Sequence, residues 1–336
     1  MGAKLLFTSN AILPIVLLIL VGYALKRIKL LPRDFFPLLN KLCFRCCLPC
    51  LLFFNVYNVQ SFGEIAEYGS VVAFAIVSIL AFFVIGFVIC VLSTKNSSQR
   101  GVILQATYRS NYAIIGISLA LSLNAEPKAA AIASVISSVT IPLFNVLATI
   151  SLTIFSRENE QRFDFLNFAK KIATNPLILG CATGFVVLFV RNFLPLNPVG
   201  EPIFTIQKNL PFVYKTLQML ANSASTIALI ALGGNFEFSA VARLGRLIAI
   251  GTSMRIVVCP LVCLLLAYKF GFSSNEFPAL IALYGTPIAV SSVPMAAEMG
   301  GDAELAGQLV VWTSLFSAFT LFATIFICAN AGIFLV

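Results

Sequence analysis

Long apolar runs separated by short polar segments form the main pattern along this chain. A helix that crosses the hydrocarbon core of a bilayer needs about 20 apolar residues. On that measure ten spans are predicted, near residues 9–27, 36–58, 66–93, 101–123, 129–155, 169–191, 211–235, 243–269, 277–297 and 304–335. The connections are too short for a separate soluble domain. The pattern therefore predicts an all-α integral membrane protein.

Composition supports this fold class. The 336 residues are 60% hydrophobic and 10% charged, whereas soluble domains are about half apolar and about a quarter charged. The net charge of +9 does not indicate a nucleic-acid partner, because the basic residues lie between apolar runs. Histidine is absent, which removes the commonest metal ligand and the usual proton carrier near neutral pH.

The distribution of basic residues predicts the orientation in the membrane. With the N-terminus outside, thirteen of the 22 Lys and Arg residues fall in inner loops, six fall outside and three lie within spans. Cytoplasmic loops carry the excess of Lys and Arg in membrane proteins. Both termini are therefore predicted on the non-cytoplasmic side of a plasma membrane, with the connecting loop 156–168 in the cytoplasm.

The two halves of the chain resemble one another. A glycine follows a proline by eight residues in spans 1 and 6, from Pro14 to Gly22 and from Pro176 to Gly184. Spans 4 and 9 align without gaps at an offset of 176, which pairs Tyr108 with Tyr284. Because each half holds an odd number of spans, the second must run inverted relative to the first. Residues 1–155 and 169–336 are thus predicted to be two inverted five-helix repeats, a plan that recurs in secondary transporters.

The segment "YRSNYAIIGIS" places Arg109 inside the fourth span, about nine residues or roughly 13 Å from its start. An arginine at that depth costs about 2.5–3.5 kcal/mol on insertion scales and usually faces a partner or a cavity. Three interpretations are open: a salt bridge within the protein, a side chain that extends to the interface, or an anionic substrate. Every acidic residue lies in or close to a loop, so Glu298 is the acid considered as a partner.

Two further arginines lie within spans. Arg255 has no polar neighbourhood of its own, so we interpret it as packing between helices or contacting a break in the backbone. Arg45 lies close enough to the cytoplasmic end of its span to extend to the interface.

The ninth span contains "YGTPIAVSSVPMA", with Pro287 and Pro294 among hydroxyl residues. Proline removes a helical hydrogen bond, and the freed groups are tolerated in a membrane only where protein or a cavity satisfies them. The repeat places Asn111 opposite Pro287. Two broken helices at matching positions of inverted halves indicate a transport site, although simple proline kinks in packed helices are the alternative.

Polar residues near these segments are the candidate site. The predicted substrate-binding residues are Arg109, Ser110, Asn111, Gly116, Thr286, Pro287, Ser291, Ser292 and Asn55. Hydroxyls of spans 5 and 10 are predicted to line the cavity or bind an ion, namely Ser137, Ser138, Thr313 and Ser314. Such hydroxyls can equally allow close helix packing or bond to their own backbone.

Enzyme chemistry is not expected. No nucleophile and base set can be built without His or a buried carboxylate, and no glycine-rich phosphate loop occurs. Four of the nine cysteines fall in "LCFRCCLPCL", where a metal or redox site is conceivable but packing is the commoner use. We predict no cofactor and no metal.

Four stretches carry a family resemblance: "LPIVLLILVGYALKR", "RSNYAIIGISLAL", "NPLILGCATGFVV" and "YGTPIAVSSVPMAAEMGGDAELAGQLVVWTSLFS". Over essentially its whole length the chain resembles the auxin efflux carrier family, which includes plant carriers and bacterial permeases for carboxylates. The resemblance implies broken helices 4 and 9 that cross near mid-membrane. It also implies a scaffold of helices 1, 2, 6 and 7 that forms a homodimer, and transport helices 3–5 and 8–10 that move as an elevator.

This chain departs from the family pattern Asn-x-Gly-x-x-Gly-x-Pro in the fourth helix. The pattern stands here as Asn111, Ala113, Gly116 and Ser118, so one glycine and the proline are missing. Whether helix 4 is broken is therefore left open, while Pro287 favours a break in helix 9. The long loop of the plant carriers is also absent, which favours a bacterial-type member in an inner membrane.

The sequence thus predicts a secondary transporter or facilitator of small organic carboxylates. A proton relay is disfavoured because no Asp, Glu or His is embedded in the spans. Coupling is expected to use Na⁺, a proton carried on the substrate, or no ion. The alternative is a ligand-gated channel or membrane receptor that has the same fold.

Overall fold

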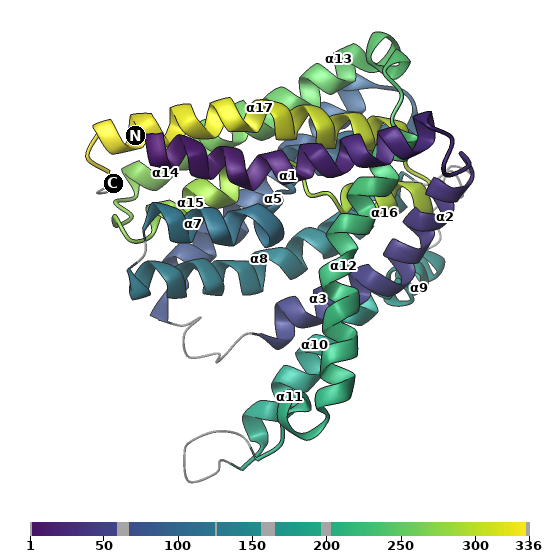
Figure 1. Cartoon of the computed structure of the whole chain (residues 1–336). Coiled ribbons are helices and arrows are strands. Elements are labelled where there is room, and N and C mark those ends of the chain that lie inside the picture. The colour runs from purple at the N-terminus through teal and green to yellow at the C-terminus, as the bar shows by residue number, and fades with distance from the viewer. Residues whose placement is uncertain (1, 59–66, 125, 156–164, 196–202, 334–336) are drawn as a thin grey trace.

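The computed structural model describes residues 2–58, 67–124, 126–155, 165–195 and 203–333, and this part of the chain is helical throughout (Figure 1). One isolated bridge is its only β-type pairing. The helices, with η for a π-helical turn, are α1 (Gly2–Arg27), α2 (Phe35–Leu42), η1 (Cys43–Cys47), α3 (Leu48–Tyr57), α5 (Gly69–Ser93), α6 (Ser97–Tyr108), η2 (Tyr112–Gly116), α7 (Ile117–Leu123), α8 (Pro127–Ile154), α9 (Phe165–Ala173), α10 (Pro176–Phe193), α11 (Ile206–Asn209), α12 (Pro211–Asn235), α13 (Ser239–Ser253), η4 (Met254–Val258), α14 (Cys259–Lys269), α15 (Phe277–Gly285), α16 (Ser292–Glu298) and α17 (Ala303–Asn330).

Helices occupy all ten ranges predicted as spans. Six helical segments in the described residues are long and apolar enough to cross a membrane, which makes this a multi-pass membrane protein: Phe35–Tyr57, Gly69–Ser93, Pro127–Ile154, Pro211–Asn235, Ser239–Lys269 and Ala303–Asn330. Two predicted spans are interrupted, one between α6 and η2 and the other between α15 and α16. The predicted central loop 156–168 lies mostly at residues 156–164, outside the described residues.

Two pairs of helices approach so closely that only glycine fits at the contact. α1 packs on α12, where a β-carbon on Gly22 would lie 2.1 Å from the carbonyl oxygen of Ile230. α10 packs on α3, where a β-carbon on Gly184 would lie 2.9 Å from the carbonyl oxygen of Phe53. Small residues allow this close approach where no hydrophobic force drives helices together in lipid. The glycines of spans 1 and 6 thus each contact a helix of the other half of the chain.

The two interrupted helices, α6–η2 and α15–α16, pack among α5, α8, α14 and α17. Every residue of α15 is buried. The hydroxyl of Tyr284 in α15 lies 2.5 Å from Oγ of Ser78 in α5, and the hydroxyl of Tyr108 in α6 lies 3.0 Å from Oγ of Ser151 in α8. These contacts place both interruptions within protein, where their free backbone groups can be satisfied.

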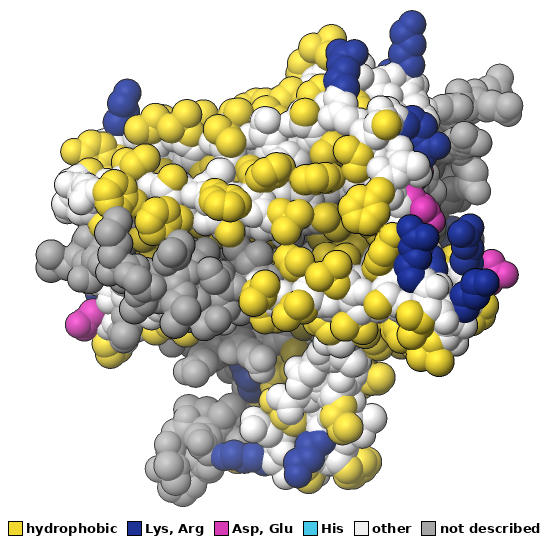
Figure 2. Space-filling view, turned by 45° about the horizontal axis from the view of Figure 1, so that its top comes forward, with side chains coloured by type: hydrophobic (Ala, Val, Ile, Leu, Met, Phe, Trp, Pro, Cys, Tyr) yellow, Lys and Arg dark blue, Asp and Glu magenta, His cyan; other side chains and the backbone are white. Residues whose placement is uncertain are grey.

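Large apolar side chains cover the outside of the molecule. Figure 2 shows them over a broad face, with Lys and Arg gathered towards its margins. On α5 the side chains of Val77, Val84 and Leu92 are 65%, 62% and 77% exposed. An exposed apolar surface of this extent is foreign to soluble monomers, and it is the surface that lipid contacts in a membrane protein.

The contact between α1 and α12 gives a first prediction. A β-carbon on Gly233 would lie 1.9 Å from the carbonyl oxygen of Ile19, so Gly233→Ala must separate the two helices. We expect Gly233→Ala to destabilise the protein by about 1–3 kcal/mol, as overpacking does elsewhere. Thermal unfolding in detergent measures the change.

Gly245→Ala in α13 is the matched control, because nothing lies within 4 Å of a β-carbon at Gly245. The control should be neutral or stabilising, since alanine is the better helix former. Equal melting temperatures for Gly233→Ala and Gly245→Ala would contradict the assignment of a tight contact.

Candidate functional site

The two interrupted helices cross each other through short extended segments. α6 ends at Tyr108 and η2 begins at Tyr112, while α15 ends at Gly285 and α16 begins at Ser292. Ser110 forms an antiparallel bridge with Ile288. The N–H of Asn111 donates to the carbonyl of Pro287 at 2.8 Å. Span 4 is therefore broken even though it lacks the glycine and the proline of the family pattern.

Arg109 lies in the first extended segment and is only 1% exposed. Its Nη1 donates to Oε1 of Gln105 at 2.7 Å and contacts Sδ of Met295 at 3.0 Å. Its Nη2 donates to Oδ1 of Asn145 and to Oγ of Ser291, each at 2.8 Å. All four partners are neutral. The guanidinium group is thus held firmly in place, but its charge is not neutralised.

The structure excludes the two interpretations of Arg109 that involve the protein alone, extension to the interface and a salt bridge with Glu298. A side chain with 1% exposure does not extend to the interface. Glu298, the acid considered as a partner, lies instead 3.7 Å from Nε of Arg45, whose side chain is 63% exposed. Among the ion pairs of the described residues, none involves Arg109.

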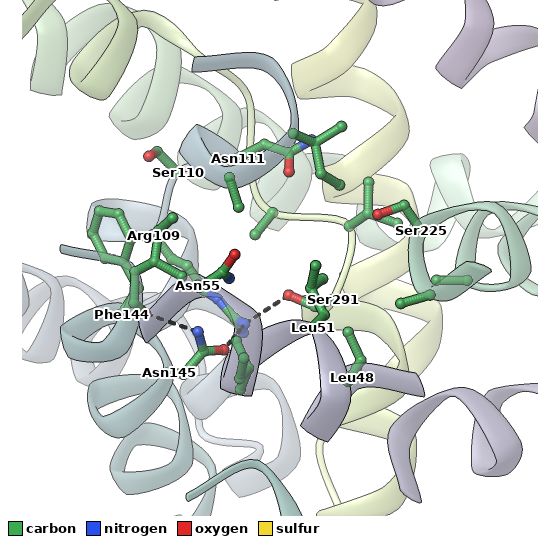
Figure 3. Close-up of a pocket in the computed structure, with 18 residues that line it drawn as sticks. Leu48, Leu51, Asn55, Arg109, Ser110, Asn111, Phe144, Asn145, Ser225 and Ser291 are labelled. Atoms are coloured by element: carbon green, nitrogen blue, oxygen red, sulfur yellow. Dashed lines mark hydrogen bonds between the residues drawn. The ribbon is translucent and has the colours of Figure 1, made fainter. Parts of the chain in front are cut away.

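A cavity of about 40 Å³ opens beside the crossing (Figure 3), which is room for roughly three water molecules. Its lining comes from α3, η2, α8, α12 and both extended segments: Leu48, Leu51, Leu52, Asn55, Arg109, Ser110, Asn111, Ala113, Ile114, Ile141, Phe144, Asn145, Ala224, Ser225, Ala228, Ala289, Val290 and Ser291. Three buried polar atoms in this lining have no hydrogen-bond partner among the described residues, namely Nδ2 of Asn55, Oγ of Ser110 and Nδ2 of Asn111. Buried polar groups are normally hydrogen-bonded, so these atoms indicate a ligand site.

Five of the predicted substrate-binding residues therefore share one cavity: Asn55, Arg109, Ser110, Asn111 and Ser291. The other four do not line it. Gly116 packs against the ring of Tyr112, and Thr286 and Pro287 contribute backbone carbonyls at the crossing. Ser292 is buried, and its hydroxyl has no hydrogen-bond partner in the part of the chain that the structure describes.

The hydroxyls predicted to line the cavity or bind an ion also lie outside its lining. Ser137 and Ser138 each donate to a carbonyl of their own helix at 2.7 Å, which is the alternative that the sequence left open. Thr313 donates to its own helix and accepts the N–H of Ile288 at 3.3 Å, so it supports the crossing from α17. Ser314 is buried, and its hydroxyl finds no hydrogen-bond partner in the described ranges.

Sequence reasoning missed the two amides that orient Arg109. Asn145 lies in α8 and is 4% exposed, and Gln105 precedes Arg109 by one helical turn in α6 and is 2% exposed. The available signal was their polarity within apolar runs, since a side-chain amide in a membrane span requires a partner. The spacing of four residues between Gln105 and Arg109 also places both on one helix face.

Arg255 is as buried as Arg109 but has a different set of partners. All of its oxygen partners are backbone carbonyls next to the two breaks. Of the two interpretations of Arg255, contact with a break in the backbone is the one that the structure shows.

Metal-binding chemistry finds no support in the described residues, where no group of three or more His, Cys, Asp or Glu residues could hold an ion. The nine cysteines are unpaired. Cys43 donates to the carbonyl of Ala224 at 3.2 Å and Cys47 accepts the hydroxyl of Ser223 at 3.7 Å, so this cluster packs α12 against η1.

Residues 7–325 match the family model described as "Membrane transport protein". No curated protein matched the sequence. The family match covers both interrupted helices and every residue that lines the cavity. The chain therefore belongs to the membrane transport protein family, the family of the auxin efflux carriers.

Proposed function

We propose that this protein is a secondary transporter, or a facilitator, of small organic carboxylates, and that the anion binds at the crossing. One observation carries the proposal. Arg109 keeps an unneutralised charge beside three buried polar atoms that lack a partner, on Asn55, Ser110 and Asn111. A positive charge next to unsatisfied donors is the arrangement that an anion completes.

The chemistry of the lining favours a carboxylate. Its two oxygens accept hydrogen bonds in the plane of the group, and the amides of Asn55 and Asn111 and the hydroxyl of Ser110 can all donate. Apolar side chains also line the cavity, among them Leu48, Leu51 and Phe144 (Figure 3). These side chains suit the carbon portion of an organic acid, and the small volume suits a small one.

An elevator mechanism accounts for the composition of the cavity. Two groups of helices line it: α3 and α12, which belong to the proposed scaffold, and α8 with the crossing, which belongs to the proposed transport domain. Movement of the second group past the first would carry Arg109 with the substrate and leave Asn55 behind. The scaffold would comprise α1, α2–α3, α9–α10 and α12, and the transport domain α5–α8 and α13–α17.

Two sets of contacts, one at the crossing and one in the scaffold, support ten spans in two inverted repeats, residues 1–155 and 169–336. At the crossing, Asn111 bonds to Pro287, its own counterpart at the offset of 176. In the scaffold, α1 packs on α12 and α10 packs on α3, so the first helix of each half contacts the second helix of the other. An approximate two-fold axis through the crossing generates both arrangements.

The remaining predictions about the assembled carrier extend this proposal. The excess of Lys and Arg in the predicted inner loops favours both termini on the non-cytoplasmic side. The family resemblance favours a bacterial-type inner membrane and a homodimer through the scaffold helices. Coupling to Na⁺ or H⁺, or transport without an ion, is compatible with the site.

The first test removes the proposed anion partner. Arg109→Ala should lower uptake of radiolabelled mono- and dicarboxylates into proteoliposomes by about tenfold to a hundredfold, the range expected for a hydrogen-bonded charge. Arg246→Ala, which removes an exposed arginine of α13, is the control. Anion uptake that is equal in Arg109→Ala and the control would refute the role given to Arg109.

A second test supplies the missing negative charge without changing shape. Oδ1 of Asn145 lies 2.8 Å from Nη2 of Arg109, so Asn145→Asp places a carboxylate there. We expect anion uptake to fall by about tenfold or more, because the arginine then has an internal counter-ion. Uptake is measured as a function of substrate concentration.

Asn145→Ala is the control for this substitution, because it removes the amide and adds no charge. If charge is the decisive property, Asn145→Asp must impair uptake more than Asn145→Ala. Equal loss in both variants would mean that Asn145 acts only by orienting Arg109.

A further inference from the structure

Arg255 contacts both interrupted helices at once. It lies in η4, between α13 and α14, and is 0% exposed. Nη1 donates to the carbonyl of Tyr108 at 3.1 Å. Nη2 donates to the carbonyls of Leu283 and Tyr284 at 2.9 and 2.8 Å, and Nε donates to that of Thr286 at 3.0 Å. Four carbonyls from two segments, far apart in sequence, therefore share one guanidinium group.

These carbonyls belong to the last turn of α6 and to the end of α15. The last four carbonyls of a helix have no partner within it, and together they carry a partial negative charge. Both helices end at the crossing, so two negative helix ends lie close to the place where the anion is proposed to bind. Without a cation these ends would oppose the binding of an anion.

We propose that Arg255 is a positioning residue for the anion site. Its planar group fixes the two half-helices relative to each other, and its charge offsets the negative potential of their ends. The geometric part stands on the contacts alone, and the electrostatic part rests on the proposed function. Arg109 and Arg255 then have different roles. Arg109 lines the cavity, whereas Arg255 lies outside the lining and binds the backbone carbonyls at the crossing.

The partners explain why an arginine occupies this position. Guanidinium offers five N–H donors in a rigid fork, whereas a lysine ammonium offers three donors at a single point. Lysine would keep the charge but would lose some of the hydrogen bonds to the four carbonyls. Glutamine would keep some donors and lose the charge.

The geometric part is tested by cross-linking at the crossing. Ser110 and Ile288 are paired in an antiparallel bridge, and paired residues of that kind have Cα atoms about 4.5–5.5 Å apart, within the range that a disulfide spans. The double variant Ser110→Cys/Ile288→Cys should therefore cross-link on mild oxidation. Mass spectrometry of the joined peptides distinguishes this disulfide from any formed by the native cysteines.

In that background, Arg255→Gln should lower the cross-linking rate by about tenfold while gel filtration remains monodisperse. Arg255→Lys should lower it by about two- to fivefold, as expected when the charge near the helix ends is kept. Arg246→Gln, an exposed arginine of α13, is the control and should cross-link as the parent does. Cross-linking of Arg255→Gln at the parent rate would overturn the proposal.

The electrostatic part is tested by uptake of radiolabelled acetate, benzoate and malonate, with the native Ser110 and Ile288 restored. Arg255→Gln should raise KM about tenfold with a smaller change in maximal rate, and Arg255→Lys should recover most of the affinity. An unchanged KM in Arg255→Gln would overturn the electrostatic part.

Two controls keep the outcomes separate. If Arg255→Gln aggregates, Arg255→Lys decides the geometric part: a cross-linking rate equal to that of the parent would overturn it. Absence of anion uptake in the unmodified protein would instead count against the proposed function, and the cross-linking comparison would still decide the role of Arg255 at the crossing.

Discussion

A helix that stops inside a membrane leaves carbonyl and N–H groups that lipid cannot bond, and the arrangement of this protein depends on how these groups are satisfied. Two helices stop at the same depth and use each other: Asn111 donates to Pro287, and Ser110 pairs with Ile288. The side chain of Arg255 donates to four carbonyls at the helix ends. The extended segments that line the cavity exist because these partners are present.

The two deeply buried arginines show that the partners of a charge define its role. Arg255 is surrounded by backbone carbonyls, which are the negative ends of two helices and therefore compensate its charge. Arg109 is surrounded by amides, a hydroxyl and a thioether, which orient it and leave its charge available. The type of residue and the depth of burial are the same in both cases. The cavity and its unpartnered donors lie on the side of Arg109.

The helical ranges could be predicted because apolar runs of membrane length are a local signal, and Arg109 could be singled out because a charge in such a run is rare. The break in α15–α16 was indicated by Pro287. The break after α6 was implied by the repeat and by the family resemblance, but its own residues left it open, since it arises from contacts with Pro287 and Arg255, which are remote in sequence. The amide of Asn145 was missed for the same reason. Ser137 and Ser138 show the converse, because a hydroxyl in a helix often bonds locally and then contributes nothing to a site.

The neutral surroundings of Arg109 have a consequence for the response of the carrier to voltage. Each elementary charge that moves through the membrane field is worth about 2.3 kcal/mol per 100 mV. In the proposed mechanism, a movement that carries Arg109 through the field would transfer one positive charge more in the empty state than in the state occupied by a monovalent anion. The membrane potential would then act unequally on the loaded and the empty protein. The size and sign of the potential would change the rate of the empty return step relative to that of the loaded step.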